Sequence, residues 1–145
     1  MAHVYSAIRG SGAFRDGTRI QVSTEAELRR AVIGFDLGDL GTRADEIRKL
    51  LLPVADAVRF AYVFGGAAAN LAFVAEGTLD GYAHTASIWD YAAGALLVTE
   101  AGGRLSNFEG GALDWSQTRL SLVATNGRVH EALLSRLGAA PGATT

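Results

Sequence analysis

Residues 89 to 101 constrain the fold more than any other stretch, because they form a helix pattern with almost no polar face. Apolar residues fill most of its positions before Thr99 and Glu100, and Gly102 and Gly103 end it. A helix with this pattern is expected to be buried on more than one side. The fold must therefore cover it from more than one direction.

Strand and helix patterns alternate along the rest of the chain. The expected strands cover residues 4–8, 13–14, 19–22, 31–35, 58–64, 78–85, 104–108 and 120–124, and the expected helices cover residues 42–52, 67–76, 89–101 and 128–137. Asp16-Gly17 between two of the early strands is a strong hairpin signal. The sequence predicts an α/β fold, a layered α/β sandwich with a mixed sheet flanked by helices and preceded by an antiparallel hairpin. We expect one domain over residues 1–138 and a disordered tail over 139–145.

Composition narrows the possible partners. Hydrophobic residues make up 49% of the 145 residues, which favours a packed globular chain over disorder. The net charge of -2 and the lack of a basic block longer than two residues argue against nucleic acid as a partner. The chain has no cysteine, which excludes disulfides, thiolate metal sites and thiol nucleophiles. No apolar run is long enough to span a membrane, so the cytoplasm is the default location.

Asp90 stands in the first turn of the predicted apolar helix, and two interpretations are open. It can act as a helix cap that accepts backbone N–H bonds and gains about 0.3–1 kcal/mol from the helix dipole. It can instead be a ligand for a hard divalent cation such as Mg²⁺, which prefers oxygen donors. One carboxylate cannot hold such an ion alone.

Four sets of residues, in order along the chain, carry a resemblance to a known family. They are Gly10 to Gly17 with Ile20, Val22 and Ser23; Gly65 to Leu71 with Val74 to Gly77 and Leu79 to Tyr82; Trp89, Asp90, Ala92, Ala93, Gly94, Leu97, Glu100, Ala101, Gly102 and Gly103; and Ala124 to Gly127. Together they resemble the C-terminal half of the inositol monophosphatase family, and the set around Asp90 resembles its C-terminal signature.

The resemblance implies Mg²⁺-dependent hydrolysis of a phosphate monoester, with a small phosphorylated polyol or sugar as substrate. It makes Asp90 the C-terminal metal ligand of the family. It places the backbone of Gly65, Gly66 and Ala67, at a helix N-terminus, against the phosphate or hydroxyls of the substrate. His84 stands near the position where many members have a Glu that binds a substrate hydroxyl, with Ala83 as the other residue that can occupy it.

This sequence departs from the family pattern in several places. The other acidic ligands of the family lie in upstream segments that this chain lacks, so we expect an incomplete Mg²⁺ site. Gly66 replaces a Ser or Thr, which removes a hydroxyl from the expected pocket. As a lone histidine, His84 is more often a surface or satisfied residue than a ligand. Asp36 and Asp39 flank a glycine-rich stretch that is better interpreted as a turn than as a cation loop.

Three hypotheses follow for the function. In the first, the chain is the C-terminal half of a phosphatase that is inactive alone and active when an N-terminal half supplies the remaining ligands. In the second, it is a non-catalytic binding or oligomerisation module of the same half-fold, whose bare strand edges favour homo-oligomers. In the third, it is an unrelated α/β domain in which Asp90 is a cap.

Overall fold

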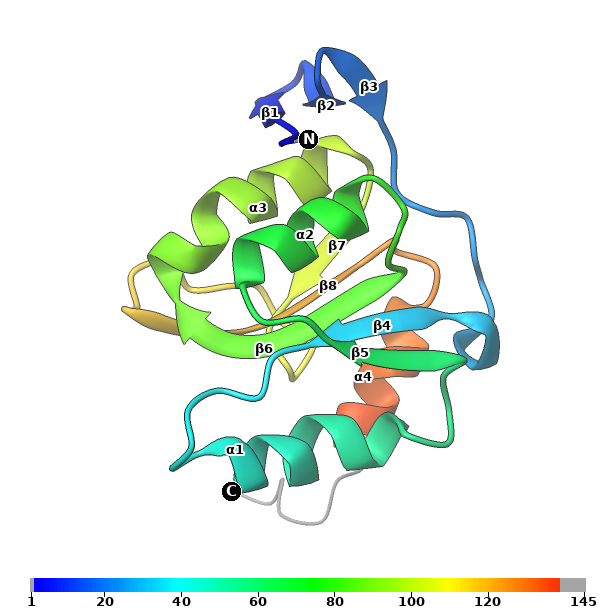
Figure 1. Ribbon diagram of the computed structural model, residues 1–145, viewed down its shortest axis with the longest axis vertical. Helices are drawn as coiled ribbons and strands as arrows, with labels where there is room; N and C mark the ends of the chain where they lie inside the picture. Colours follow the sequence, from blue (N-terminus) through cyan, green and yellow to red (C-terminus); the bar gives the residue numbers. More distant parts are fainter. Residues whose placement is uncertain (1, 139–145) are drawn as a thin grey trace.

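The computed structural model describes residues 2–138 and contains two sheets (Figure 1). The smaller sheet is an antiparallel meander of β1 (Tyr5–Ile8), β2 (Gly12–Arg15) and β3 (Thr18–Ile20). The larger sheet has the strand order β5-β4-β6-β8-β7. Its strands are β4 (Val32–Phe35), β5 (Phe60–Val63), β6 (Gly81–Ser87), β7 (Arg104–Ser106) and β8 (Arg119–Thr125). Because β4 pairs in parallel with β5 and β6 while β8 is antiparallel to β6 and β7, the predicted mixed sheet is confirmed.

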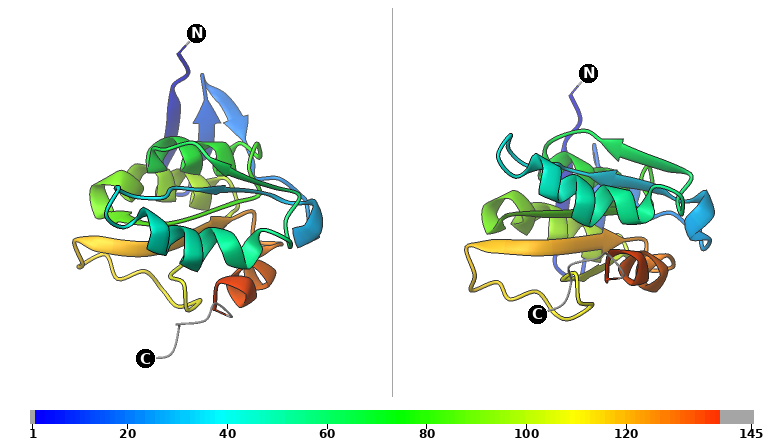
Figure 2. Two further views of the ribbon diagram at one scale, coloured as in Figure 1. Left: turned by 60° about the horizontal axis from the view of Figure 1, so that its bottom comes forward. Right: turned by 90° about the horizontal axis from the view of Figure 1, so that it is seen from below.

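Helices cover both faces of the larger sheet, as expected for a layered fold (Figures 1 and 2). The helices α2 (Ala67–Ala75) and α3 (Ile88–Glu100) lie on one face, between this sheet and the meander. The other face carries α4 (His130–Gly138) and a helical segment that begins with α1 (Arg43–Glu46). That segment continues as a π turn over Ile47–Leu51 and a 3₁₀ turn over Leu52–Val54.

Several predicted boundaries need correction. Pro53 lies in the last helical turn of the α1 segment, which ends one residue later, close to the predicted end. A short 3₁₀ turn at Leu28–Arg30 lies outside the expected helices. The predicted tail, residues 139–145, lies outside the described residues. No helix among residues 2–138 is long and apolar enough to cross a membrane.

The packing of α3 differs from the sequence prediction. Its inner face is buried and includes Tyr91, Gly94 and Val98. At Gly94 the helix passes so close to α2 that an added Cβ atom would lie 2.5 Å from Leu71 side-chain atoms. Its other face carries small or apolar residues that remain exposed, namely Trp89, Ala92 and Ala93. The meander packs against the C-terminal end of α3, whereas these exposed residues lie in its N-terminal half. The helix is therefore buried less completely than its composition suggests.

Two glutamates attach the meander to the ends of the two inner helices. The Glu100 carboxylate, at the end of α3, accepts the backbone N–H groups of Gly10 and Gly12 at 2.8 and 2.9 Å. These bonds hold the pKa of Glu100 below its usual range. Glu76, which follows α2, accepts the hydroxyl of Tyr5 at 2.8 Å and the guanidinium of Arg15 at 2.9 Å. The meander is thus attached at both helix C-termini.

Asn126 ties three parts of the chain together. Its Nδ2 donates to Ser23 Oγ and to the Glu25 carbonyl, both at 2.8 Å. Its Oδ1 accepts the backbone N–H groups of Arg128 at 2.9 Å and Val129 at 3.2 Å, directly before α4. The side chain is only 5% exposed, so water cannot readily replace these partners.

Asn126→Ala is expected to lower the free energy of unfolding by about 2 kcal/mol, because it leaves the Arg128 and Val129 N–H groups and the part-buried Glu25 carbonyl without this partner. Urea unfolding monitored by circular dichroism measures the change. Asn126→Asp keeps the acceptor for the two N–H groups but places a carboxylate oxygen against the Glu25 carbonyl, so we expect it to destabilise the chain as well. Equal stability of the alanine variant and the parent chain would contradict this account.

A buried histidine lies on the other side of the sheet. His130 is fully buried, and its Nε2 and Nδ1 atoms lie 2.9 Å from Ser106 Oγ and Thr125 Oγ1. Ser106 Oγ donates to the Asn107 carbonyl, and Thr125 Oγ1 accepts the Gly127 N–H. Thr125 therefore donates to Nδ1 and Nε2–H donates to Ser106, which is an arrangement for a neutral imidazole.

Candidate functional site

A cavity of about 340 Å³ opens where β4 and β5 end and where α2 begins. This is the edge at which the carboxyl ends of parallel strands commonly form binding sites. Its lining residues come from the loops after β4 and β5, from the start of α2, from β6 and from the first turn of α3. They are Asp36, Gly38, Asp39, Gly65, Gly66, Ala67, His84, Ala86 and Asp90. All five residues that the sequence singled out, Gly65, Gly66, Ala67, His84 and Asp90, thus line one cavity.

A second cavity of about 470 Å³ shares several of these residues. Asp39, His84 and Asp90 line both. Glu46 and Arg119 line only the second, so Arg119 adds the one positively charged side chain among the residues lining the two cavities. The two cavities together form a predominantly acidic region.

The chain turns sharply from β5 into α2 at two glycines. Gly65 and Gly66 adopt φ angles of 68° and 91°, in a region that side-chain-bearing residues rarely enter. Gly66 is the N-cap residue of α2, and the first N–H groups of a helix have no partner within it. The sequence departure at Gly66 therefore removes a hydroxyl but keeps a helix N-terminus that can receive an anion.

Asp90 is exposed in the first turn of α3. Ser87, not Asp90, is the N-cap residue, and no hydrogen bond to the Asp90 carboxylate is found within residues 2–138. The capping interpretation thus keeps its dipole contribution but not its hydrogen bonds. A free, exposed carboxylate fits a hard cation, but the described residues contain no group of three or more His, Asp or Glu placed to hold one.

Asp36 lines the first cavity, although the sequence analysis interpreted it only as flanking a turn. It follows β4 directly, is only 7% exposed, and accepts the Tyr82 hydroxyl on Oδ2 at 2.7 Å. Burial and this bond raise the pKa of Tyr82, which keeps the phenol protonated. The expected turn begins only after this residue. The sequence feature that could have indicated a site residue is a charged side chain directly after a buried strand.

His84 is buried rather than at the surface, with 8% of its area exposed. The Tyr91 hydroxyl donates to its backbone carbonyl at 2.8 Å, which fixes the strand against α3. Burial raises the pKa of Tyr91. Neither His84 Nδ1 nor Asp36 Oδ1 has a hydrogen-bond partner within the described chain, although both atoms are buried. The expectation of a surface or satisfied histidine is therefore wrong.

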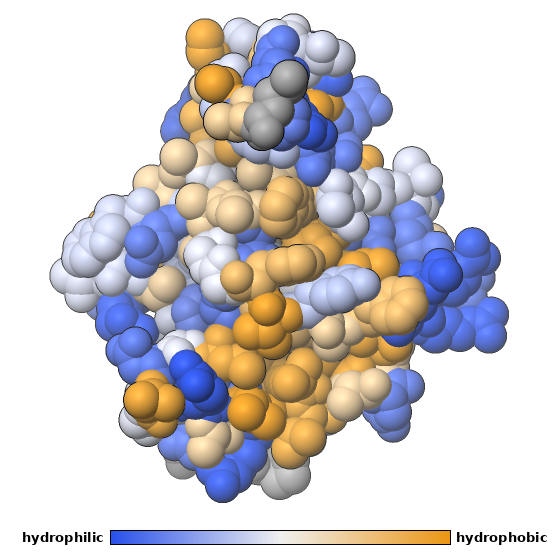
Figure 3. All heavy atoms as spheres, viewed as in Figure 1, coloured by the Kyte–Doolittle hydropathy of each residue, from blue (hydrophilic) through white to orange (hydrophobic). Residues whose placement is uncertain are grey.

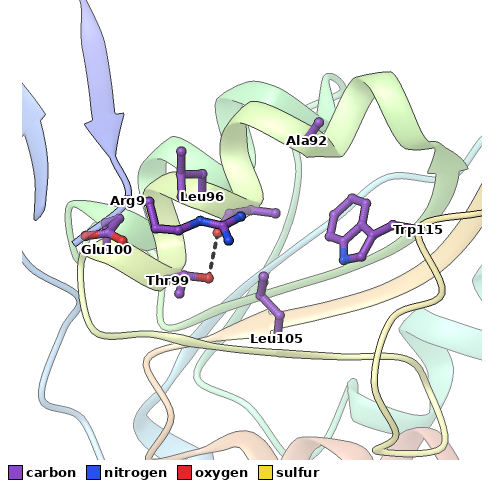
Figure 4. Close-up of a pocket in the computed structure, with 8 residues that line it drawn as sticks. Arg9, Ala92, Leu96, Thr99, Glu100, Leu105 and Trp115 are labelled. Carbon is purple, nitrogen blue, oxygen red and sulfur yellow. Dashed lines mark hydrogen bonds between the residues drawn. The ribbon is translucent and has the colours of Figure 1, made fainter. Parts of the chain in front are cut away.

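Apolar surface outside these cavities remains exposed. A further cavity of about 560 Å³ lies along α3, and Leu96, Leu105 and Trp115 line it together with Arg9 (Figure 4). Hydrophobic side chains also gather over the edge strand β5 (Figure 3). All four residues of β5 are exposed, and the rings of Tyr62 and Phe64 stack at 5.2 Å.

Comparisons with known proteins identify the family of the chain. The model of the inositol monophosphatase family matches residues 1–141. The chain is 38% identical to an inositol-1-monophosphatase of Mesorhizobium japonicum over 143 residues, covering 92% of this chain and 50% of that protein. It is also 38% identical to the Nus factor SuhB of Salmonella typhimurium, covering 92% of this chain and 50% of that protein.

Solved structures show the same relationship. The inositol monophosphatase from Anabaena (Nostoc) sp. PCC 7120 matches with a TM-score of 0.87 and 30% identity, over 96% of this chain and 55% of that chain. Mycobacterium tuberculosis SuhB matches with a TM-score of 0.82 and 32% identity, over 98% of this chain and 56% of that chain. The chain thus spans about half the length of the relatives that it matches. The ordered motifs, the layered fold and these similarities show that the chain belongs to the inositol monophosphatase family.

Proposed function

We propose that this chain forms one side of a Mg²⁺-dependent phosphatase site for small phosphorylated polyols or sugars. Asp90 is the ligand it contributes to Mg²⁺, and the start of α2 at Gly66 and Ala67 receives the phosphate or hydroxyls of the substrate. The chain is inactive alone, because the remaining ligands come from a segment that corresponds to the other half of its relatives. Bound Mg²⁺ would polarise the phosphoryl group and activate a water molecule.

One observation carries the proposal. The free carboxylate of Asp90 lines the same cavity as the N-terminus of α2. A carboxylate oxygen suits Mg²⁺, and unpaired backbone N–H groups suit an anion. Because the described residues offer no group of three acidic or histidine ligands, this chain needs oxygen donors from elsewhere to hold the ion firmly.

Reconstitution tests the proposal. The half of the Mesorhizobium japonicum relative that this chain does not cover is co-expressed with the chain, and phosphate release from inositol 1-phosphate is measured with and without Mg²⁺. We expect no turnover by either half alone and Mg²⁺-dependent turnover by the purified pair. Turnover by the 145-residue chain alone, abolished in Asp90→Asn, would overturn the need for a second half.

The exposed β5 edge favours a second candidate function, a non-catalytic module that associates with copies of itself. Phe60, Tyr62 and Val63 are 48%, 42% and 48% exposed on a strand that is paired on one side only. Such an edge can accept another strand. Light scattering that shows a monomer at high concentration, unchanged in Tyr62→Lys, would count against this candidate.

A further inference from the structure

We propose that Asp36 and His84 form a subsite for a protonated amine, so that the preferred ligand is a phosphorylated amino sugar or amino polyol. This inference rests on the proposed function for the phosphate part of the ligand. The amine part rests on the two side chains alone, which lie in the cavity that also contains Asp90.

The first argument is the missing donor at Asp36. Tyr82 donates to Oδ2, so this oxygen of Asp36 already has a hydrogen-bond partner. Its other oxygen is buried and has no donor within residues 2–138. A buried acceptor without a partner is costly, and the cost is larger for a charged group. A ligand that brings an N–H donor to Asp36 Oδ1 would remove this energetic cost.

His84 supplies the second argument. Its Nδ1 atom is also buried and unpartnered, and the side chain lines the same cavity as Asp36. A neutral imidazole with the proton on Nε2 offers a lone pair at Nδ1. An ammonium group has three N–H donors, which is enough for both Asp36 Oδ1 and His84 Nδ1. A hydroxyl has one donor and can satisfy only one of the two acceptors.

The acidic lining of the cavity also favours a cationic group in the ligand. Asp36, Asp39 and Asp90 line it, and neither lysine nor arginine is among its lining residues. Even when Mg²⁺ pairs with Asp90, the carboxyl group of Asp36 is left without a cationic partner among the residues that line this cavity. A cationic group at Asp36 is attracted by a carboxylate, whereas a neutral hydroxyl gains much less. In the proposed function, the phosphate part of the ligand is received at the start of α2.

The test compares two ligands that differ by one group. Glucosamine 6-phosphate and glucose 6-phosphate are titrated into the 145-residue chain by calorimetry at about pH 6.5, where the amine is protonated. We expect the amino sugar to bind about tenfold more tightly. In Asp36→Asn, which keeps an acceptor for Tyr82, this preference should disappear, so that the two sugar phosphates bind with affinities that differ by less than about twofold.

Two controls separate the possible outcomes. Asp45→Asn makes the same charge change on exposed α1, outside both cavities, and should keep the preference. Thermal unfolding checks that each variant is folded, and His84→Gln provides a second variant that should weaken the preference. Equal affinity for the two sugar phosphates in the parent chain would overturn the amine subsite and leave the proposed function standing.

Glucosamine and glucose without phosphate distinguish the remaining cases. If neither sugar phosphate binds but glucosamine still binds more tightly than glucose, the subsite is supported and the phosphatase proposal fails. If neither pair shows a preference for the amine, the subsite is overturned. A loss of Mg²⁺ affinity in Asp36→Asn, without any amine preference in the parent chain, would assign Asp36 to cation binding instead.

Discussion

Asp90→Asn is expected to lower kcat/KM for phosphate-ester hydrolysis by about a thousandfold or more when the chain is paired with the missing half of a relative. The amide keeps the size of the side chain but removes the negative charge that pairs with Mg²⁺. A catalytic metal supplies several kcal/mol of transition-state stabilisation, and each 1.36 kcal/mol changes the rate about tenfold. Initial rates of phosphate release over a Mg²⁺ titration measure the loss.

The folded structure should barely change in this variant. Asp90 is exposed, and its carboxylate accepts no hydrogen bond among the described residues, so only the dipole contribution of below about 1 kcal/mol is lost. Asp56→Asn is a matched control, because Asp56 is exposed, forms a 3.6 Å ion pair with Arg136 and lines neither of the two cavities around Asp90. Equal losses of activity in the two variants would show that Asp90 has no special role.

Acidification is expected to destabilise the chain through His130. Burial, assisted by the charge of Arg104, lowers the pKa of His130 from 6.5 to about 4. Above the unfolded pKa the histidine is neutral in both states, so its full contribution is present. As the pH falls from 6.5 toward 4, the unfolded chain binds a proton that the folded chain does not, and stability falls by about 3 kcal/mol.

The hydrogen bonds around the ring explain why protonation is unfavourable. Thr125 donates to Nδ1, so a proton at that atom would turn an acceptor into a donor and break the bond. Urea unfolding of the parent chain and of His130→Gln, measured at several pH values, isolates the effect, because the carboxylates titrate in both proteins. We expect the difference in stability to narrow as the pH falls. Parallel curves would contradict the assignment.

The sequence predicts the fold well where local patterns and burial agree. The Asp16-Gly17 turn, the glycines after α3 and the apolar runs of β4 and β8 place those elements within a few residues. The prediction fails at the outer face of α3, where Ala92 and Ala93 are apolar but exposed. Composition reports what a helix can bury, whereas the amount it does bury depends on neighbours far away in sequence.

The candidate site was predictable only in part. The family motifs identify Asp90, Gly66 and their neighbours, and the fold brings them to one cavity. Asp36 could not be identified in this way, because its role depends on Tyr82, which lies 46 residues further along the chain. The burial of His84 likewise comes from the packing of β6 between two strands and under α3.

The two glutamate contacts connect the meander to the cavity through the inner helices. Glu76 and Glu100 form hydrogen bonds to the meander at the C-terminal ends of α2 and α3. Gly66 and Asp90 lie at the opposite ends of the same two helices. The meander and the cavity are therefore connected through the full length of the same two helices. A protein bound to the meander would contact α2 and α3 at the ends farthest from the cavity.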